Sequence, residues 1–337
     1  MHTTLHSRKT RTTHLAAFVA STSAVVLALT GCASTNNTSD PGAEVLTPLT
    51  LQAAWVNDAE FMGYFVAIDE GMYEDAGIDL EYLSGGPNVI PESSLLSGDA
   101  DIALTSPDTT ISAITGQGAD FVIIGAQYQQ SPLGIVSLAE SDITEPADLI
   151  GKTVAVPDVN RLAFSAMLEI NDIDAAEVTV VPYAYDPTPL TSGEVDATLD
   201  FVTNVPYTLE ELGYETNSFT LYDAGYRIPN DTVVVTRETL ESQEDALRAW
   251  LTASIDGWEM NFADPDAYPA QFEDTWFAGT GRTIENELFF NNAQVDLIES
   301  PTGMFRLTDE AIQDTIDTLA LIGIDATTEM FDMSLFD

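Results

Sequence analysis

The spacing of apolar residues along this chain changes repeatedly between two periods. Leu49 and Leu51 alternate with polar neighbours, and a period of two predicts a half-buried strand. Short apolar runs also predict strands, and the one at 121–124 is typical of buried parallel sheets. Together these patterns predict strands at 49–51, 78–82, 102–104, 121–124, 153–156, 178–181, 197–199 and 233–235. Helices are predicted between them, at 61–70, around 95–96, at 106–115, from 161 and at 207–212. This alternation of strands and helices predicts an α/β fold with largely parallel sheets.

The last hundred residues have a different, helical character. Trp250 and Trp258 fall on the apolar face of one helix, so they are predicted to be core rather than site residues. Thr308 is predicted to cap a final helix whose Ile312 and Leu319 face inward. Roughly 300 residues exceed one typical core, so the chain is expected to form two lobes.

The N-terminal segment has the pattern of a secretory signal. Arg8, Lys9 and Arg11 form a positive region, and residues 15–29 are apolar or small. This apolar run is about as long as the central region of a signal peptide and is short for a membrane span. Residues 1–31 are therefore predicted to be a signal peptide.

Cys32 is the single cysteine of the chain and follows directly on this segment. Small residues before a cut and a cysteine after it resemble the bacterial lipobox, which implies cleavage before Cys32 and acylation of its thiol. Residues 32–46, rich in Ser, Thr, Asn, Gly and Pro, are predicted to be a lipidated flexible tether. The alternative is a plain signal peptide with an incidental cysteine. The cut also removes all three histidines, which excludes histidine- and thiolate-based catalysis and zinc sites.

The chain is strongly acidic. All 55 Asp and Glu residues lie from position 32 onward, together with only seven of the 10 Lys and Arg residues. This part of the chain therefore has a formal net charge of −48. Such a surface does not attract nucleic acid or an anionic membrane, so no nucleic-acid partner is expected. Lys152 is the single lysine left, and this favours a salt-adapted surface over an ordinary acidic secreted protein.

A series of short motifs carries a family resemblance. Residues 55–67 contain Trp-x-Asn-x-x-Glu-Phe-x-Gly-Tyr, and the series continues through Gly71-Met-Tyr, Ser97-Gly-Asp-Ala-Asp, Asp148-Leu-Ile-Gly-Lys and Gly193-Glu-Val-Asp to Ala253–Trp258. In this order and spacing they resemble the solute-binding proteins of nitrate, sulfonate, taurine and thiamine-precursor ABC importers. The resemblance implies a two-lobed periplasmic-binding-protein fold (type II), in which each lobe is a mostly parallel sheet flanked by helices. It implies lobe 1 at 47–138 and 237–337 and lobe 2 at 139–236.

Within that family the chain looks most like binders of vitamin-type heterocycles, either thiamine pyrimidine precursors or riboflavin. A flat heterocycle needs aromatic faces and a few amide or carboxylate partners. Trp55, Asn57, Glu60, Phe61 and Tyr64 could supply both. Phe61 and Tyr64 could equally be core residues of the first helix. Thiamine-precursor binders tend to have histidine near position 60, where this chain has Glu60, which keeps the riboflavin alternative open.

Further candidates are chosen by position, because they follow predicted strands or lie near the expected crossings between lobes. They are Gly86, Ser106, Asp108, Gln127, Asn160, Arg161, Phe201, Asn204 and Tyr226. Ser106 could be only a helix cap, and Arg161 could pair with one of the many acids.

The sequence thus predicts a monomeric, lipid-anchored receptor on the outer face of the cytoplasmic membrane. Two lobes would close around a small aromatic N-heterocycle and deliver it to an ABC permease, without cofactor, metal or catalysis. One alternative is a receptor for a small anion such as a sulfonate, taurine or nitrate. The other is an enzyme that uses paired carboxylates such as Glu60 and Asp108.

Overall fold

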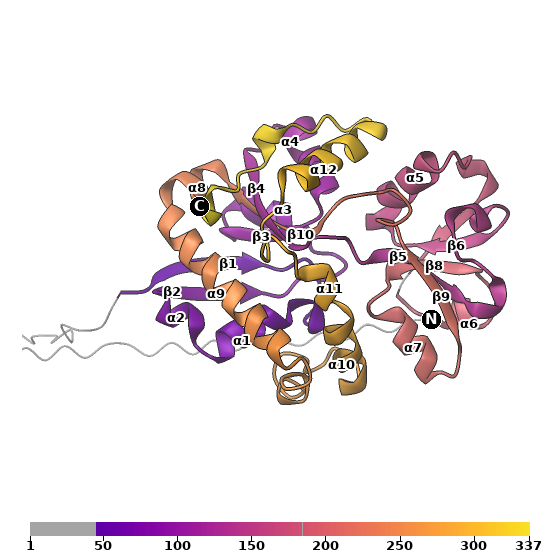
Figure 1. Cartoon of the computed structure of the whole chain (residues 1–337), viewed down its shortest axis with the longest axis horizontal. Coiled ribbons are helices and arrows are strands. Elements are labelled where there is room, and N and C mark those ends of the chain that lie inside the picture. Colours follow the sequence, from indigo (N-terminus) through magenta and orange to yellow (C-terminus); the bar gives the residue numbers. More distant parts are fainter. Residues whose placement is uncertain (1–44, 184) are drawn as a thin grey trace, which may run out of the picture. The chain divides into compact units, whose positions relative to one another are not determined.

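The computed structural model describes residues 45–183 and 185–337 (Figure 1). Cys32, the predicted signal peptide and nearly all of the predicted tether lie outside the described residues. Among the described residues, no helix is both long and apolar enough to cross a bilayer. Residues Glu44–Asp337 form one compact unit that is built around two sheets.

The first sheet has five strands in the order β2-β1-β3-β10-β4 within the described part of the chain. The strands are β1 (Thr47–Gln52), β2 (Ile78–Leu83), β3 (Ile102–Thr105), β4 (Phe121–Tyr128) and β10 (Asn230–Thr236). Every residue of β3 and β4 is buried, because helices cover both faces of this sheet.

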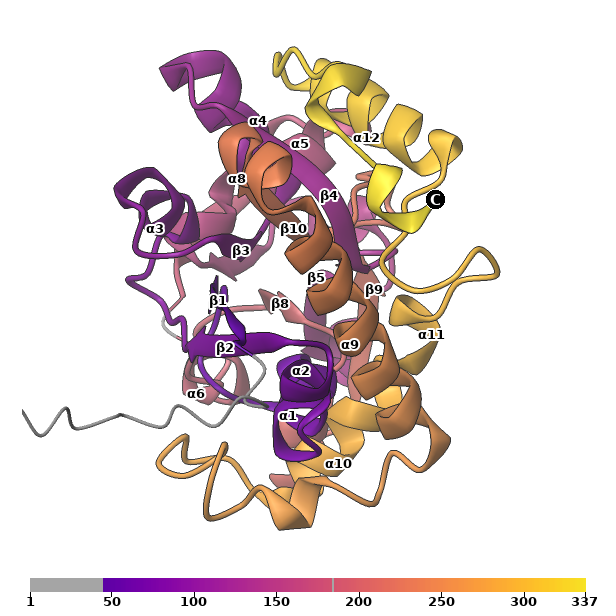
Figure 2. The same ribbon diagram turned by 90° about the vertical axis from the view of Figure 1, so that its left-hand side faces the viewer.

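The helices of this first lobe come from both ends of the described chain. The early ones are α1 (Met62–Asp69), α2 (Met72–Asp75), α3 (Pro91–Ser97) and α4 (Pro107–Gln117). The late ones are α8 (Arg237–Ser242), α9 (Glu244–Ala263), α10 (Ile284–Ala293), α11 (Val295–Ile298) and α12 (Asp309–Leu321). Figure 2 shows α9 running beside α1 and α2, to which it packs. Trp250 and Trp258 of α9 are fully buried, and Thr308 caps α12, as the sequence predicted.

The second sheet has the order β7-β6-β8-β5-β9, again counted over the described residues. Its strands are β5 (Leu133–Leu138), β6 (Thr153–Val156), β7 (Thr179–Pro182), β8 (Ala197–Phe201) and β9 (Thr216–Thr220). The helices α5 (Arg161–Ile170), α6 (Thr188–Thr191) and α7 (Val205–Glu211) flank it. The α/β prediction is therefore confirmed for both lobes.

Both sheets are mixed, but each contains a single reversed strand among its five described strands, so the expectation of mostly parallel sheets is confirmed. β1 pairs in parallel with β2 and β3, and β6 pairs in parallel with β7 and β8. In contrast, β10 is antiparallel to β3 and β4, and β5 is antiparallel to β8 and β9. The apolar run at 121–124 predicted a strand with a parallel neighbour, but β4 pairs with the reversed strand β10, because burial on both faces reflects coverage by helices and not the direction of the neighbouring strand.

The reversed strand in each sheet is the one that the chain reaches by crossing between lobes. The chain leaves β4 at Tyr128 and enters the second sheet at Leu133, and it returns between Thr220 and Asn230. The predicted boundaries placed 133–138 in lobe 1 and 230–236 in lobe 2. Strand pairing places each segment in the opposite sheet, so these boundaries need correction. Apolar pattern alone carries no information about which sheet a strand joins.

Candidate ligand-binding site

A cavity of about 780 Å³ lies between the two sheets. Its walls are formed by segments that follow strands: 54–60 after β1, 86–92 after β2, 105–109 after β3, 159–163 after β6, residues 183 and 185–187 after β7, and 200–211 from the end of β8. Both crossings and the segment 280–290 complete the lining. The carboxyl ends of strands are where ligands bind in open α/β sheets, so this cavity is the candidate ligand site.

Aromatic rings from both lobes face this cavity. The Trp55 ring lies 4.7 Å, centroid to centroid, from the ring of Tyr185 in the second lobe, and Tyr183 lies 5.3 Å from Tyr185. Three further aromatic residues line the cavity: Phe201, Tyr226 and Phe290. Such faces are suited to contact with a planar ring.

Two buried acids, Glu60 and Asp231, form a carboxyl pair in the wall of the cavity. They are 4% and 1% exposed and come from the helical turn after β1 and from the start of β10. Burial raises the pKa of Asp231 to about 7, and burial together with the charge of Asp231 raises the pKa of Glu60 well above its usual value. Burial and the proximity of the two carboxyls therefore favour the protonated form of both.

An ion-pair network behind this pair fixes its position. Arg282 Nη2 lies 2.8 Å from Asp58 Oδ2, and Arg282 Nε lies 3.8 Å from Glu287 Oε1. Asp58 accepts a hydrogen bond from the backbone N–H of Glu60 at 3.0 Å, and Glu287 accepts one from Ala59 at 2.6 Å. Burial raises the pKa values of Asp58 and Glu287, and the Arg282 guanidinium opposes this. The positive charge of Arg282 is therefore neutralised by the protein itself.

Asp108, which opens α4, is held from both sides. The Ser106 hydroxyl donates a hydrogen bond to its Oδ1, and the Tyr226 hydroxyl donates to its Oδ2 at 3.1 Å. Tyr226 belongs to the return crossing, so this contact ties the crossing to α4. Ser106 precedes α4 in extended backbone, but its side chain makes no capping hydrogen bond, because it is bonded to Asp108 instead.

The structure brings most of the sequence-predicted site residues together at this cavity. Those that line it are Trp55, Glu60, Gly86, Ser106, Asp108, Asn160, Phe201, Asn204 and Tyr226. Those that do not are Asn57, Phe61, Tyr64, Gln127 and Arg161.

Phe61 and Tyr64 are core residues, and both are fully buried in the first lobe. The Phe61 ring lies 6.5 Å from that of Phe65, and the Tyr64 ring lies 6.2 Å from those of Trp250 and Trp258. Neither residue lines the cavity, because the Phe61 ring packs against Phe65 and Tyr82 and the Tyr64 ring packs against α9, which was the core alternative considered for both.

The other three residues outside the lining have different surroundings. Arg161 pairs with Asp158 at 2.7 Å on the surface, which was the alternative considered for it. Gln127 is buried and donates from Nε2 to the backbone oxygen of Glu60 at 2.7 Å, so it supports the site from behind. The Oδ1 atom of Asn57 is buried without a hydrogen-bond partner among the described residues.

Sequence reasoning missed several lining residues. Tyr183 and Tyr185 directly follow a predicted strand, so their position could have identified them. Asp231 lies at the start of β10, a strand that the predicted boundaries place in the second lobe. Arg282 and Asp58 meet across more than 200 residues of sequence, and no local pattern indicates such a contact.

Two α/β lobes, two crossings and a cavity between the sheets define the class of periplasmic binding proteins. Solved structures with this fold include the periplasmic aliphatic sulphonate binding protein SsuA from Escherichia coli, with a TM-score of 0.64 and 16% identity over 81% of this chain and 91% of that chain. The periplasmic nitrate-binding protein NrtA from Synechocystis PCC 6803 has a TM-score of 0.57 and 12% identity over 86% and 87%. The desulfurization enzyme DSZB also has the fold, with a TM-score of 0.53 and 15% identity over 81% and 91%. At these identities the likeness concerns the fold alone.

The family follows from the sequence match. Residues 58–268 match the NMT1/THI5-like family model, and the chain belongs to this family. Among characterised relatives, the formylaminopyrimidine-binding protein of Halalkalibacterium halodurans is 28% identical over 249 residues, which span 72% of this chain and 73% of the relative. The predicted family resemblance and the periplasmic-binding-protein fold are thereby confirmed.

Proposed function

We propose that this protein is the solute-binding component of an ABC importer and captures a small aromatic N-heterocycle between its lobes. The ligand is of the thiamine-pyrimidine-precursor or riboflavin type. The observation that carries the proposal is the lining of the cavity, where aromatic rings from both lobes, led by Trp55 and Tyr185, stand beside buried carboxyls. The relative named as a formylaminopyrimidine-binding protein supports the pyrimidine half of this class.

The geometry suits capture by closure. A ligand that touches Trp55 on one lobe and Tyr185 on the other binds the closed arrangement better than an open one, so it shifts the population toward closure. The two short crossings, 129–132 and 221–229, are the segments that would absorb this hinge motion. The cavity volume lies within the usual range for small-molecule sites.

A small anion fits this cavity less well. Among the described lining residues Arg282 is the single basic one, and two carboxylates already neutralise it. An anion would therefore face a wall of acids and would depend on backbone N–H groups and neutral side-chain donors.

We also propose that the protein is a receptor and not an enzyme. Glu60 and Asp108 both line the cavity, but Asp108 is occupied by hydrogen bonds from Ser106 and Tyr226. Recovery of each bound ligand chemically unchanged, as judged by mass spectrometry, is the expected outcome. A converted ligand would favour the carboxylate-enzyme alternative.

The proposed location is the outer face of the cytoplasmic membrane, with a lipid on Cys32 as the anchor and an ABC permease as the partner. The acidic domain would not be held by anionic lipids, so the anchor is the expected means of attachment. A Cys32→Ser variant should move from the detergent phase to the aqueous phase on phase separation. An unchanged distribution would contradict lipid anchoring.

The ligand class is tested by a thermal-shift panel in buffer with high salt. The compounds are riboflavin, hydroxymethylpyrimidine, formylaminopyrimidine, thiamine, taurine, an alkanesulfonate and nitrate. A ligand at 100 times its Kd stabilises the folded protein by about 2.7 kcal/mol. Stabilisation by taurine, the sulfonate or nitrate alone would contradict the heterocycle proposal.

The variant Trp55→Ala tests the proposed contact between the ligand and the Trp55 ring. Loss of a stacked aromatic side chain is expected to weaken heterocycle binding about tenfold, on the order of 1.4 kcal/mol. Tyr214→Ala, which removes a partly exposed aromatic ring outside the cavity, is the control. Unchanged binding by Trp55→Ala would remove Trp55 from the site.

A further inference from the structure

The charged residues that line the cavity are mostly acidic. Seven carboxylic side chains line it among the described residues: Asp58, Glu60, Glu92, Asp108, Asp200, Glu211 and Asp231. Arg282 is the single basic residue beside them, and its charge is taken by Asp58 and Glu287. The remaining acids have no basic side chain in the lining to balance them.

Among these acids Glu60 has an unfavourable environment for a charge, because it is only 4% exposed although it lines the cavity. Within residues 45–183 and 185–337, no N–H group donates a hydrogen bond to its carboxylate oxygens. The amide of Gln127 is close, but it donates to the backbone oxygen of Glu60 at 2.7 Å and reaches Asp231 Oδ2 at 3.4 Å. A buried carboxylate without donors is costly, and a positive group placed beside it removes much of that cost.

The opposite wall joins aromatic rings to another acid. Asp200 is partly buried at the end of β8, lines the cavity together with Tyr183, and accepts a hydrogen bond from the backbone N–H of Phe201 at 2.7 Å. Tyr183 packs against Tyr185, which in turn contacts Trp55. Aromatic faces attract cations through their quadrupoles, and carboxylates near the rings add to this attraction.

We propose that the ligand is an aromatic N-heterocycle that carries a positive charge, with the charge against Glu60 and Asp231 and the ring against Trp55 and Tyr185. This inference rests on the proposed solute-binding function and narrows its ligand class. A neutral heterocycle would supply no charge to balance these carboxyls, because Arg282, the single basic residue of the described lining, is already paired with Asp58 and Glu287. A cation supplies that charge and also gains from contact with the aromatic faces.

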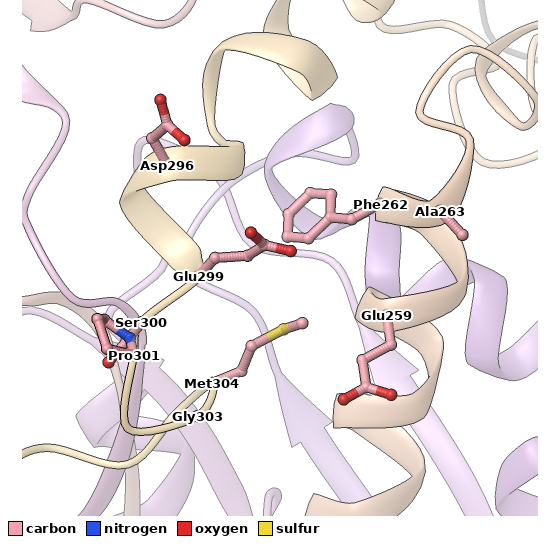
Figure 3. Close-up of a pocket in the computed structure, with 9 residues that line it drawn as sticks. All are labelled: Glu259, Phe262, Ala263, Asp296, Glu299, Ser300, Pro301, Gly303 and Met304. Carbon is pink, nitrogen blue, oxygen red and sulfur yellow. The ribbon is translucent and has the colours of Figure 1, made fainter.

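A second group of acidic residues lines a hollow outside the cavity. It lies on the surface of the first lobe, where Figure 3 shows Glu259, Glu299, Phe262 and Met304 around it. Its acids surround an open surface, and no aromatic ring of the second lobe takes part in its lining. Glu299 therefore serves as a control position for removal of one negative charge outside the cavity.

The test is calorimetric titration with ligand pairs that differ in charge. One pair is 1-methylnicotinamide and nicotinamide, which share a ring and an amide; the other is thiamine and hydroxymethylpyrimidine. The measurements are made on the protein in about 1 M salt, where the Debye length of about 3 Å screens the overall acidic field. At least one cationic member is expected to bind ten times more tightly than its neutral partner.

The possible results separate this inference from the proposed function. Tighter binding of the neutral members, or binding of neutral heterocycles alone, overturns the cation inference and leaves the heterocycle receptor standing. Failure of every heterocycle, together with binding of taurine or nitrate, overturns both. Failure of both cationic members to bind also overturns the inference.

Two variants locate the charge contact. Glu60→Gln and Asp231→Asn are each expected to weaken binding of the cation at least tenfold, and to weaken it more than they change binding of its neutral partner. Glu299→Gln should leave both affinities unchanged. If either cavity variant does not fold, as judged by circular dichroism, Asp200→Asn replaces it, with a smaller loss of about threefold expected. Cation preference that persists in all folded cavity variants would overturn the inference.

Discussion

Asp231 illustrates how strongly a single residue of this site is constrained. Its backbone φ of 45° lies in the left-handed region, which aspartate and asparagine tolerate better than most residues. The residue is 1% exposed, and its carboxyl accepts a hydrogen bond from Gln127 Nε2 at 3.4 Å. Since burial raises its pKa to about 7, the folded protein holds a proton there that the unfolded chain releases near pH 4.

This proton makes stability depend on pH. The contribution of Asp231 is greatest below pH 4, where the unfolded chain is protonated too, and it is lost as the pH rises toward 7. The free energy of unfolding in 2 M salt is therefore expected to fall between pH 5 and pH 8, by about 1.4 kcal/mol for each unit of the pKa shift that lies in this window. Denaturant titrations at both pH values measure this difference.

Asp231→Asn removes the titrating group and keeps its shape and backbone preference. The fall in stability between pH 5 and pH 8 should therefore be smaller in this variant, while Glu299→Gln should retain it. An identical pH dependence in Asp231→Asn and the unsubstituted protein would show that Asp231 is not the source.

At the scale of elements, the contact of α1 with α9 depends on two glycines. A Cβ atom on Gly257 would lie 2.3 Å from the backbone oxygen of Gly63, and one on Gly63 would lie 2.2 Å from the Trp258 ring. The sequence predicted both helices and the buried tryptophans of α9. It did not predict this close approach, because a helix pattern identifies the buried face and not the partner that covers it.

Gly257→Ala is therefore expected to destabilise the protein, although alanine favours helices. Overpacking of this kind costs about 1–3 kcal/mol, against a gain in helix propensity of roughly 1 kcal/mol. Gly116→Ala in α4 is the matched control, since a Cβ there meets no atom within 4 Å and the propensity gain should appear alone. Equal thermal unfolding midpoints for the two variants would contradict the packing argument.

At the scale of the whole molecule, the two lobes also touch beside the cavity. The Tyr207 ring of α7 stacks on the Phe289 ring of α10 with centroids 5.1 Å apart, and Asn286 Nδ2 donates to Thr208 Oγ1 at 3.3 Å. These contacts join the second lobe to the first at a place separate from the crossings. They stabilise the arrangement in which both lobes reach the ligand.

Phe289→Ala should therefore weaken ligand binding about threefold to tenfold, mainly through faster dissociation, because the closed arrangement loses a stacking contact. Stopped-flow measurements of association and dissociation check this. The exposed ring variant Tyr214→Ala is the control. A lower association rate with unchanged dissociation would argue that Phe289 acts on ligand entry instead.

The sequence by itself determined the class of fold and the family, and most of the site residues that it predicted lie at the cavity. Strand and helix periods are local, and segments that follow strands, such as those at Trp55, Ser106 and Phe201, gather at one edge whatever the details of packing.

The tertiary structure decided the rest. It assigned β5 and β10 to their sheets, turned Phe61 and Tyr64 into the core, and joined Arg282 to Asp58. These outcomes depend on which surfaces meet across long stretches of chain. Contacts between segments that are distant in sequence bury charged groups and shift their pKa values, and a local pattern of apolar and polar residues does not specify those contacts.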